Sequence, residues 1–317
     1  MELKENQYKE SEIGIIPYDW EVTSLGDITI KVGSGITPTG GEKVYKLEGR
    51  IFLRSQNIGN GKLFLQDVAY IDDEIHNTFT SSEIHEKDVF LNITGASIGR
   101  SAVANSVVVH GNVNQHVCII RVNQASLDPY YLNYFLSSQN GQKQINNYQA
   151  GGNRQGLNFE QIKSFQIPLP TKPEQIAIAT ALSDTDALIE NLEKLLVKKR
   201  NIKQCIMHKL LSPKKYWETR KIIDIVSTPV TDGPHETPRF LKEGIPFLSV
   251  NNLVNNRIDF NELRFISLED NQLYSKKCKP QKNDILLGKA ASVGKVAILD
   301  SDLEINIWSP IALIRPR

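Results

Sequence analysis

The 317-residue chain has little cysteine, no long apolar run and almost no net charge. Its three cysteines (Cys118, Cys205 and Cys278) are odd in number and far apart, which excludes a disulfide framework and a cysteine-based metal site. We find no apolar stretch near 18 residues and no signal-peptide pattern, so no membrane span is predicted. We therefore expect a cytoplasmic protein.

Histidine is also scarce and shows no metal-ligand spacing, so no metal site is predicted. Residues 288–295 imitate a phosphate loop, but Val296 stands where Ser or Thr must hold magnesium, which excludes an ATP site of that type. The net charge of +1 argues against indiscriminate coating of polyanions and still allows a local basic face. A hydrophobic content of 40% and a charged content of 23% are typical of a globular protein, and the length favours two domains.

The longest regular pattern runs over residues 171–213 and predicts one long helix. Thr171, Pro173 and Glu174 are typical of a helix start, and Pro213 marks its end. Apolar residues recur there every three or four positions, as in a coiled coil, with Lys199 as the interruption. A seam this long would be exposed on a single helix, so we expect a partner helix to cover it. The predicted helix-pairing residues are Leu182, Leu188, Leu192, Leu195, Ile202, Ile206 and Leu210.

The same motifs occur on both sides of this helix, at an offset of about 195 residues, which indicates an internal duplication. The second copy ends in the strand equivalent to residues 118–121, so it lacks counterparts of residues 122–212, including a second helix. We predict domains at 1–170 and 214–317, the second incomplete at its C-terminus, joined by the helix 171–213. The paired segments are 50–58 with 245–253, 87–91 with 283–287, 96–100 with 291–295, and 118–121 with 312–315.

Each copy is rich in short segments bounded by Gly, Asn, Asp and Pro, which favours strands at 88–93, 101–104 and 117–122. Short helices are predicted after Asp128-Pro129 and after Asn158, whose partner Gln161 completes a capping box. The fold class is therefore α+β, with two similar mixed domains and a long helical spacer.

Two motifs imitate catalytic sites. Residues 95–99 fit the G-x-S-x-G pattern around a nucleophilic serine, but a strand rather than a helix is predicted to follow, so we interpret them as a tight turn. Asp128-Pro129-Tyr130-Tyr131 is close to the motif with which adenine methyltransferases hold a flipped base. Because no glycine-rich cofactor loop accompanies it, a helix N-cap explains it more simply.

Amides, hydroxyls and cations remain at the predicted turns of both copies. Such side chains suit base edges and phosphates: Asn and Gln pair with adenine, Arg and Lys with guanine or phosphate, and Asp with cytosine. The candidate DNA-binding residues are Lys31, Ser34, Arg54, Gln56, Asn57, Ser97, Arg100, Asn112, Asn114, Gln115, Arg154, Asp232, His235, Asn251, Asn252, Lys289, Ser292, Lys295 and Asn306. No catalytic or metal-binding residue is predicted.

With these motifs in place, the chain resembles the specificity subunit of type I restriction-modification systems, the HsdS family. The resemblance covers essentially the whole sequence. It is carried by Ile16-Pro17-x-x-Trp20, Leu25-x-Asp27-Ile28, the turn 95–99, the helix start from Leu169-Pro170 to Glu174-Gln175, the helix end around Lys209-Leu210-Leu211, and Asp232-Gly233-Pro234-His235-x-Thr237-Pro238.

The resemblance implies two target-recognition domains that each read half of a split DNA sequence, separated by conserved-region helices. It also implies that this chain is not an enzyme and binds no cofactor. S-adenosylmethionine would bind to modification subunits, and ATP with magnesium to a restriction subunit. The missing second helix implies a truncated chain or pairing with a second copy of itself. The alternatives left open are a self-sufficient DNA adenine methyltransferase, or its detached recognition region, and a purely structural scaffold.

Overall fold

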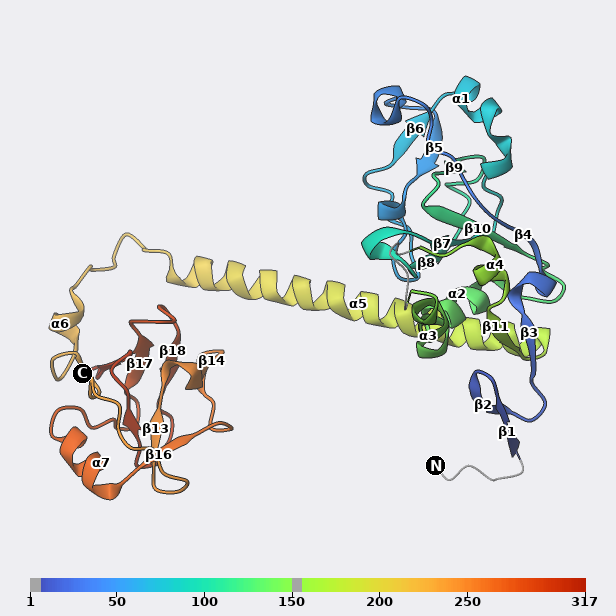
Figure 1. The fold of residues 1–317 in the computed structure, drawn as a ribbon. Helices are drawn as coiled ribbons and strands as arrows, with labels where there is room; N and C mark the ends of the chain where they lie inside the picture. Colours follow the sequence, from blue (N-terminus) through green and yellow to red (C-terminus); the bar gives the residue numbers. More distant parts are fainter. Residues whose placement is uncertain (1–6, 150–155) are drawn as a thin grey trace. The chain divides into compact units, whose positions relative to one another are not determined.

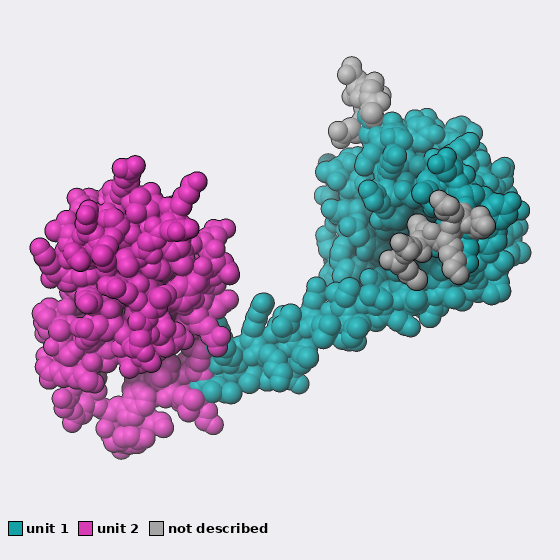
Figure 2. Space-filling model, turned by 90° about the horizontal axis from the view of Figure 1, so that it is seen from below, with its two compact units in different colours: residues 1–206 teal, residues 207–317 magenta. Residues whose placement is uncertain are grey.

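The structure, a computed structural model, describes residues 7–149 and 156–317. The chain divides into two compact units, Met1–Ile206 and Met207–Arg317 (Figure 2). Unit 1 contains the first predicted domain together with most of the long helix. Unit 2 contains the second.

A four-stranded antiparallel sheet in the order β4-β10-β7-β8 forms the centre of unit 1 (Figure 1). Its strands are β4 (Thr29–Ser34), β7 (Val89–Asn92), β8 (Ser101–Val103) and β10 (Val117–Val122). Side chains alternate between the faces of a strand. In β10, Cys118 and Ile120 therefore enter one core, whereas Val117 and Ile119 enter the other.

Helices supply the first of these cores, and a smaller sheet adjoins the second. The helices are α2 (Pro129–Ser137), α3 (Gln139–Asn147) and α4 (Phe159–Lys163). The smaller sheet has the order β6-β5-β9, with β5 parallel to β9, and helix α1 follows β6 in the chain. Its elements are β5 (Arg50–Leu53), β6 (Ala69–Ile71), β9 (Asn112–Val113) and α1 (Asp73–Thr78).

The predicted caps of α2 and α4 are confirmed. The Asp128 carboxylate accepts hydrogen bonds from the backbone N–H groups of Tyr130 and Tyr131, and Asn158 with Gln161 forms a capping box. Two further strand pairs belong to unit 1. They are β1 (Tyr8–Ser11) with β2 (Gly14–Pro17), and β3 (Glu21–Ser24) with β11 (Gln166–Leu169).

Unit 2 repeats both sheets in the same strand order, which confirms the duplication. The larger sheet is β12-β20-β17-β18 and the smaller is β16-β13-β19, again with one parallel pair. The bounds are β12 (Thr231–Asp232), β13 (Ile245–Leu248), β16 (Arg264–Ile266), β17 (Ile285–Gly288), β18 (Val296–Ile298), β19 (Asn306–Ile307) and β20 (Ile311–Ile314). The remaining elements are α6 (Ile222–Ile225), β14 (Leu253–Val254), β15 (Arg257–Ile258) and α7 (Leu268–Ser275).

One backbone crossing is the same in both units. A Cβ added to Gly35 would lie 1.5 Å from the carbonyl oxygen of Val113, and one added to Gly233 would lie 1.7 Å from that of Ile307. Any side chain is therefore excluded at both positions, because a chain segment crosses there in direct backbone contact.

The long helix α5 spans Lys172–Leu211, 40 residues, or about 60 Å at 1.5 Å per residue. Its first turns are fixed to unit 1. The buried Gln175 amide donates to the carbonyl oxygens of Ser126 (3.0 Å) and Pro170 (2.9 Å) and accepts from the Asp128 N–H (2.8 Å). The carboxylate of Glu174 accepts a hydrogen bond from the Trp20 indole (3.2 Å).

Candidate nucleic-acid interface

Two predicted base-contacting amides lie inside the protein in the same environment. The Asn57 side chain accepts from the N–H of Arg54 (2.9 Å) and donates to two carbonyl oxygens further along the loop (both 2.9 Å). Asn252 does the same in unit 2, accepting from the N–H of Ser249 (2.9 Å) and donating at 3.1 and 3.2 Å. Both are buried and hold a loop in shape, so their amides are occupied internally.

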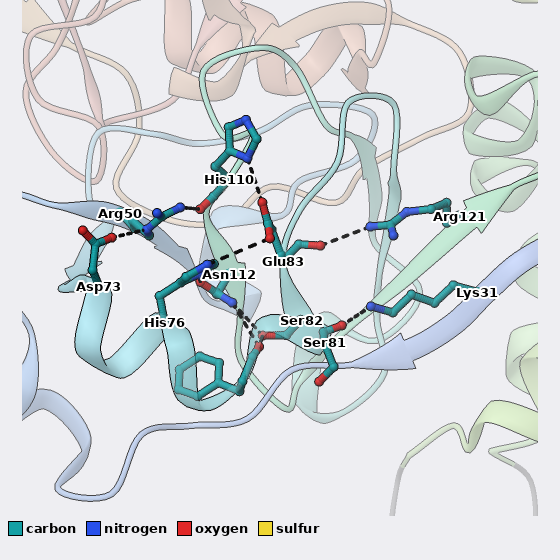
Figure 3. A network of polar contacts seen from close by, with 11 residues as sticks. Lys31, Arg50, Asp73, His76, Ser81, Ser82, Glu83, His110, Asn112 and Arg121 are labelled. Carbon is teal, nitrogen blue, oxygen red and sulfur yellow. Dashed lines mark hydrogen bonds and ion pairs between the residues drawn. The ribbon is translucent and has the colours of Figure 1, made fainter.

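Asn112 and Asn306 also lie at equivalent buried positions. In unit 1, Asn112 accepts from His76 Nδ1 (2.7 Å) and donates to Ser82 Oγ (2.9 Å), as Figure 3 shows. In unit 2, Asn306 donates to the side-chain oxygen of Asn271 (3.0 Å). These contacts connect the parallel strand of the small sheet to its neighbouring helix.

Asn114 and Ser34 contribute to the crossing between β4 and β9. Asn114 is buried and accepts from the N–H of His116 (3.1 Å), and Ser34 is half-buried. The neighbouring Gln115 is exposed. Its oxygen accepts from Thr37 and its amide donates to His116 Nε2 (3.2 Å). Gln115 therefore presents a polar group at the surface of this crossing.

Arg54 and Gln56 meet at one acidic side chain. Gln56 donates to Asp67 (2.8 Å), Arg54 lies 3.7 Å from the same carboxylate and 3.7 Å from Glu42, and its guanidinium lies over the Tyr45 ring at 5.6 Å. Gln56 is exposed, whereas the Arg54 side chain is only 17% exposed. This cluster therefore places the exposed Gln56 amide beside two carboxylates and a guanidinium.

The G-x-S-x-G segment is a tight turn between β7 and β8, as expected. Ser97 Oγ accepts from the Asn92 amide (3.0 Å), and Arg100 is exposed at the end of the turn. The equivalent turn of unit 2 places Ser292 half-buried and Lys295 exposed. In both units the turn presents one cation to solvent.

Lys31 lies on β4 and is half-buried. Its ammonium donates to the carbonyl oxygen of Ser81 (Figure 3). Burial, and then the positive charge of Arg121, lowers the pKa of Lys31. Nearby, a hydrogen bond from His110 Nδ1 (2.7 Å) lowers the pKa of Glu83.

In unit 2 the predicted residues Asp232, His235 and Lys289 come together, with Lys277 as a fourth member. The Asp232 carboxylate binds the ammonium groups of Lys277 and Lys289 and lies 3.3 Å from His235 Nε2. Burial by itself raises the pKa of Asp232, but hydrogen bonds and charge from the two lysines outweigh it and hold that pKa below its ordinary value.

Asn251 is exposed on the η7 turn (Val250–Asn252) of the same unit. Arg154 lies outside the described residues.

Sequence reasoning missed a buried ion pair that occurs in both units. Arg121 donates to both oxygens of Asp88 (2.7 and 2.8 Å) and to the carbonyl of Glu83 (3.1 Å). Arg315 makes the same contacts with Asp284 (2.8 and 2.7 Å) and with the carbonyl of Lys279 (2.9 Å). Both pairs fall within the repeated segments, so their recurrence at matched positions was the signal available.

The predicted helix-pairing residues all lie in the exposed part of α5. Every residue from 181 to 211 is exposed, and the seam side chains Leu182, Leu188, Leu192, Leu195, Ile202, Ile206 and Leu210 are 42–60% exposed.

Within residues 7–149 and 156–317, no helix combines the length and apolar character needed to cross a bilayer. The same residues contain no cluster of three His, Cys, Asp or Glu side chains suited to a metal.

Comparisons with known proteins agree with this architecture. The chain is 30% identical over 216 residues to the putative type I restriction enzyme MjaX specificity subunit of Methanocaldococcus jannaschii, covering 66% of this chain and 49% of the relative. It is 26% identical over 342 residues to the MjaIX specificity subunit of the same organism, covering 94% and 76%. The chain spans about half the length of several curated relatives that it matches.

Solved structures share the fold. The HsdS subunit from Thermoanaerobacter tengcongensis matches with a TM-score of 0.53 and 17% identity, over 95% of this chain and 76% of that one. The S subunit of a type I restriction-modification system from M. genitalium matches with a TM-score of 0.51 and 16% identity, over 94% and 72%. Residues 17–198 and 214–308 match the family described as type I restriction modification DNA specificity domain, and this chain belongs to that family.

Proposed function

We propose that this chain is the DNA-specificity subunit of a type I restriction-modification complex in the cytoplasm. Residues 1–170 and 214–317 would each read one half of a bipartite double-stranded target, and residues 171–213 would set their separation. The chain itself would catalyse nothing. Modification subunits would bind S-adenosylmethionine and methylate adenine, and a restriction subunit would use ATP and magnesium.

The observation that carries this proposal is that the two units share their scaffold and differ at their exposed turns. The internal residues recur in type and in contact, as with Asn57 and Asn252. The more accessible ones do not: exposed Gln56 corresponds to exposed Asn251, and half-buried Ser34 corresponds to half-buried Asp232. Two domains that recognise different half-sites need a shared scaffold and different turn residues. Contacts to bases determine specificity, whereas the scaffold only positions the residues that make those contacts.

The family relationship favours this function over a self-sufficient methyltransferase. The related chains are named specificity subunits. Measuring S-adenosylmethionine binding to the full chain separates the two: we expect none, and micromolar binding would overturn the proposal.

We further infer that the seam of α5 pairs with a helix of a second copy of this chain. This pairing is supported by seven large apolar side chains at coiled-coil spacing. Each of them is exposed over more than 40% of its surface. The basic C-terminal half and the acidic N-terminal half of α5 would face each other in an antiparallel pair.

Mapping adenine methylation in cells that carry the complex tests the proposed function. We expect a bipartite motif with a fixed gap, and loss of that motif when the chain is deleted. Gln56→Ala should relax only one half of the motif, and His235→Ala only the other, because the two residues belong to different units. A continuous motif, or changes in both halves from either variant, would contradict the assignment.

A further inference from the structure

Unit 2 contains a pocket of about 400 Å³ with three cationic side chains in its wall, Lys277, Lys279 and Arg315. Hydroxyl groups of Thr231 and Ser275 line it as well. The wall is held in place by Arg315, which binds both Asp284 oxygens and the backbone carbonyl of Lys279. The backbone of Lys279 is therefore held in place at its carbonyl, while the residue itself is exposed.

The equivalent region of unit 1 has different side chains, among them Lys31, Ser81 and Glu83 (Figure 3). Arg121 binds the carbonyl of Glu83 there, so Glu83 occupies the position of Lys279, and Ser81 that of Lys277. Lys31 pairs with Arg121 across β4 and β10 and extends its ammonium to the Ser81 carbonyl.

In unit 2 no lysine from the edge strand fills this space. Extending the β12–β20 register by two residues places Pro229 opposite Arg315, where unit 1 has Lys31. Thr228 and Pro229 both line the pocket. The two copies therefore differ in a coordinated way: the side chain that would block the space is absent, and Ser81 and Glu83 are replaced by two lysines.

The charges of the pocket do not cancel. Asp284 neutralises Arg315, and Asp232 is shared between Lys277 and Lys289. Lys279 adds a further positive charge, so the site has an excess of cations over carboxylates. The residues that line the pocket carry ammonium, guanidinium and hydroxyl groups, which are the donors that match the oxygens of a phosphate group.

We propose that this pocket binds one phosphate of the DNA backbone beside the half-site read by unit 2. The inference rests on the proposed function and extends it, because a backbone contact positions the reader without selecting a base. Unit 1 has no such contact at this place, since Lys31 occupies it. The two readers would then hold DNA differently.

Pro229→Lys gives the sharpest test, because it introduces into unit 2 the lysine that unit 1 has at the equivalent position. Added positive charge alone would strengthen binding of a duplex, whereas a filled pocket would weaken it. Using the full chain and a duplex of arbitrary sequence, we expect affinity to fall by roughly tenfold at low salt, the value of one charge-assisted contact. Unchanged or increased affinity would overturn the inference.

Lys279→Ala should weaken the same duplex comparably and reduce the slope of log affinity against log salt concentration by about one. The matched control is Lys276→Ala, an exposed lysine at the end of α7 that does not line the pocket. We expect the control to change affinity less than twofold. Equal effects of the two variants would show that Lys279 contributes only through its charge, without a specific phosphate contact, and would overturn the inference. Unchanged thermal midpoints would exclude misfolding.

Inorganic phosphate separates failure of the pocket from failure of the proposed function. Amide chemical shifts of Lys279 and Arg315 should move on titration of the wild-type chain with phosphate, and should not move in Pro229→Lys. If wild-type chain binds the duplex while both pocket variants bind equally well, DNA recognition stands and the pocket assignment fails. If phosphate binds but no duplex does, the pocket serves a free anion and the backbone assignment fails.

Discussion

At the scale of single residues, each unit contains an equivalent ion pair between a buried aspartate and an arginine. Asp88 is 1% exposed, as is Asp284, and each receives two hydrogen bonds from its arginine. Removing one partner of such a pair leaves an uncompensated charge in the interior, which costs more than the pair itself contributes.

Arg121→Met should therefore destabilise unit 1 by about 3–5 kcal/mol. Urea unfolding followed by circular dichroism measures the loss. Lys194→Met is the control, because its partner Glu190 is exposed on α5 and the pair lies in water. A loss for Arg121→Met no larger than that of the control would show that Asp88 remains solvated.

Asp232 predicts a pH dependence for unit 2. Its folded pKa lies below the ordinary value of 3.8, because the two lysines outweigh the effect of burial. A depressed carboxyl pKa gives stabilisation that is complete above about pH 4 and is lost as the pH falls through the folded pKa. The stability difference between wild type and Asp232→Asn should shrink over that interval in urea titrations, and a difference independent of pH would contradict it.

The placement of amides shows where sequence reasoning ends at this scale. Amide and hydroxyl residues at turns were grouped as base-contacting candidates, but Asn57 and Asn112 point inward and Gln56 outward, one position from Asn57. The residue types in a turn do not reveal which of its side chains points into the protein. Comparing the two copies does, because buried residues such as Asn57 and Asn252 are the same in both and have the same spacing.

At the scale of elements, the crossing at Gly35 depends on the absence of a side chain. Gly35→Ala should destabilise unit 1 by about 1–3 kcal/mol or more, because the added Cβ overlaps the Val113 carbonyl. Gly33→Ala is a close control, since the nearest atom to its Cβ is the end of Lys31, at 3.8 Å. Thermal unfolding should leave the Gly33 variant within about 0.5 kcal/mol of wild type. Equal losses would contradict the structure.

The seam of α5 predicts a second element-level effect. Leu195→Asp should weaken self-association of the full chain at least tenfold, whereas Val197→Asp should not. Both side chains are exposed, 46% and 55%, but position 197 lies off the heptad seam. Analytical ultracentrifugation over a concentration series measures this. A monomer at all concentrations would contradict pairing with a second copy.

Long and periodic elements could be predicted from the sequence, and short non-local ones could not. The 40 residues of α5 and the strand β10 follow from apolar spacing and from caps. The parallel pair β5 and β9 was not foreseen, because β9 has only two residues and its pairing depends on contacts with a strand distant in sequence.

At the scale of the whole molecule, the proposed function makes the gap in the DNA target depend on helix length. Inserting one heptad in the exposed part of α5 lengthens it by about 10 Å while nearly preserving the direction of its seam. At about 3.4 Å per base pair, methylation mapping should show a gap wider by up to about three base pairs, with both half-sites unchanged. An unchanged gap would show that α5 does not set the spacing.

The contacts of the Gln175 amide affect how precisely the far end of α5 is positioned. Together with the hydrogen bond from Trp20 to Glu174, this amide joins the first turns of α5 to unit 1 through three backbone groups, and the far end of the helix lies about 54 Å away. Over such a lever arm, an angular error of about 5° at this anchor moves the tip by about 5 Å, more than one base-pair step of about 3.4 Å. Under the proposed function, the angular tolerance of this anchor thus limits how precisely α5 sets the distance between the two half-sites.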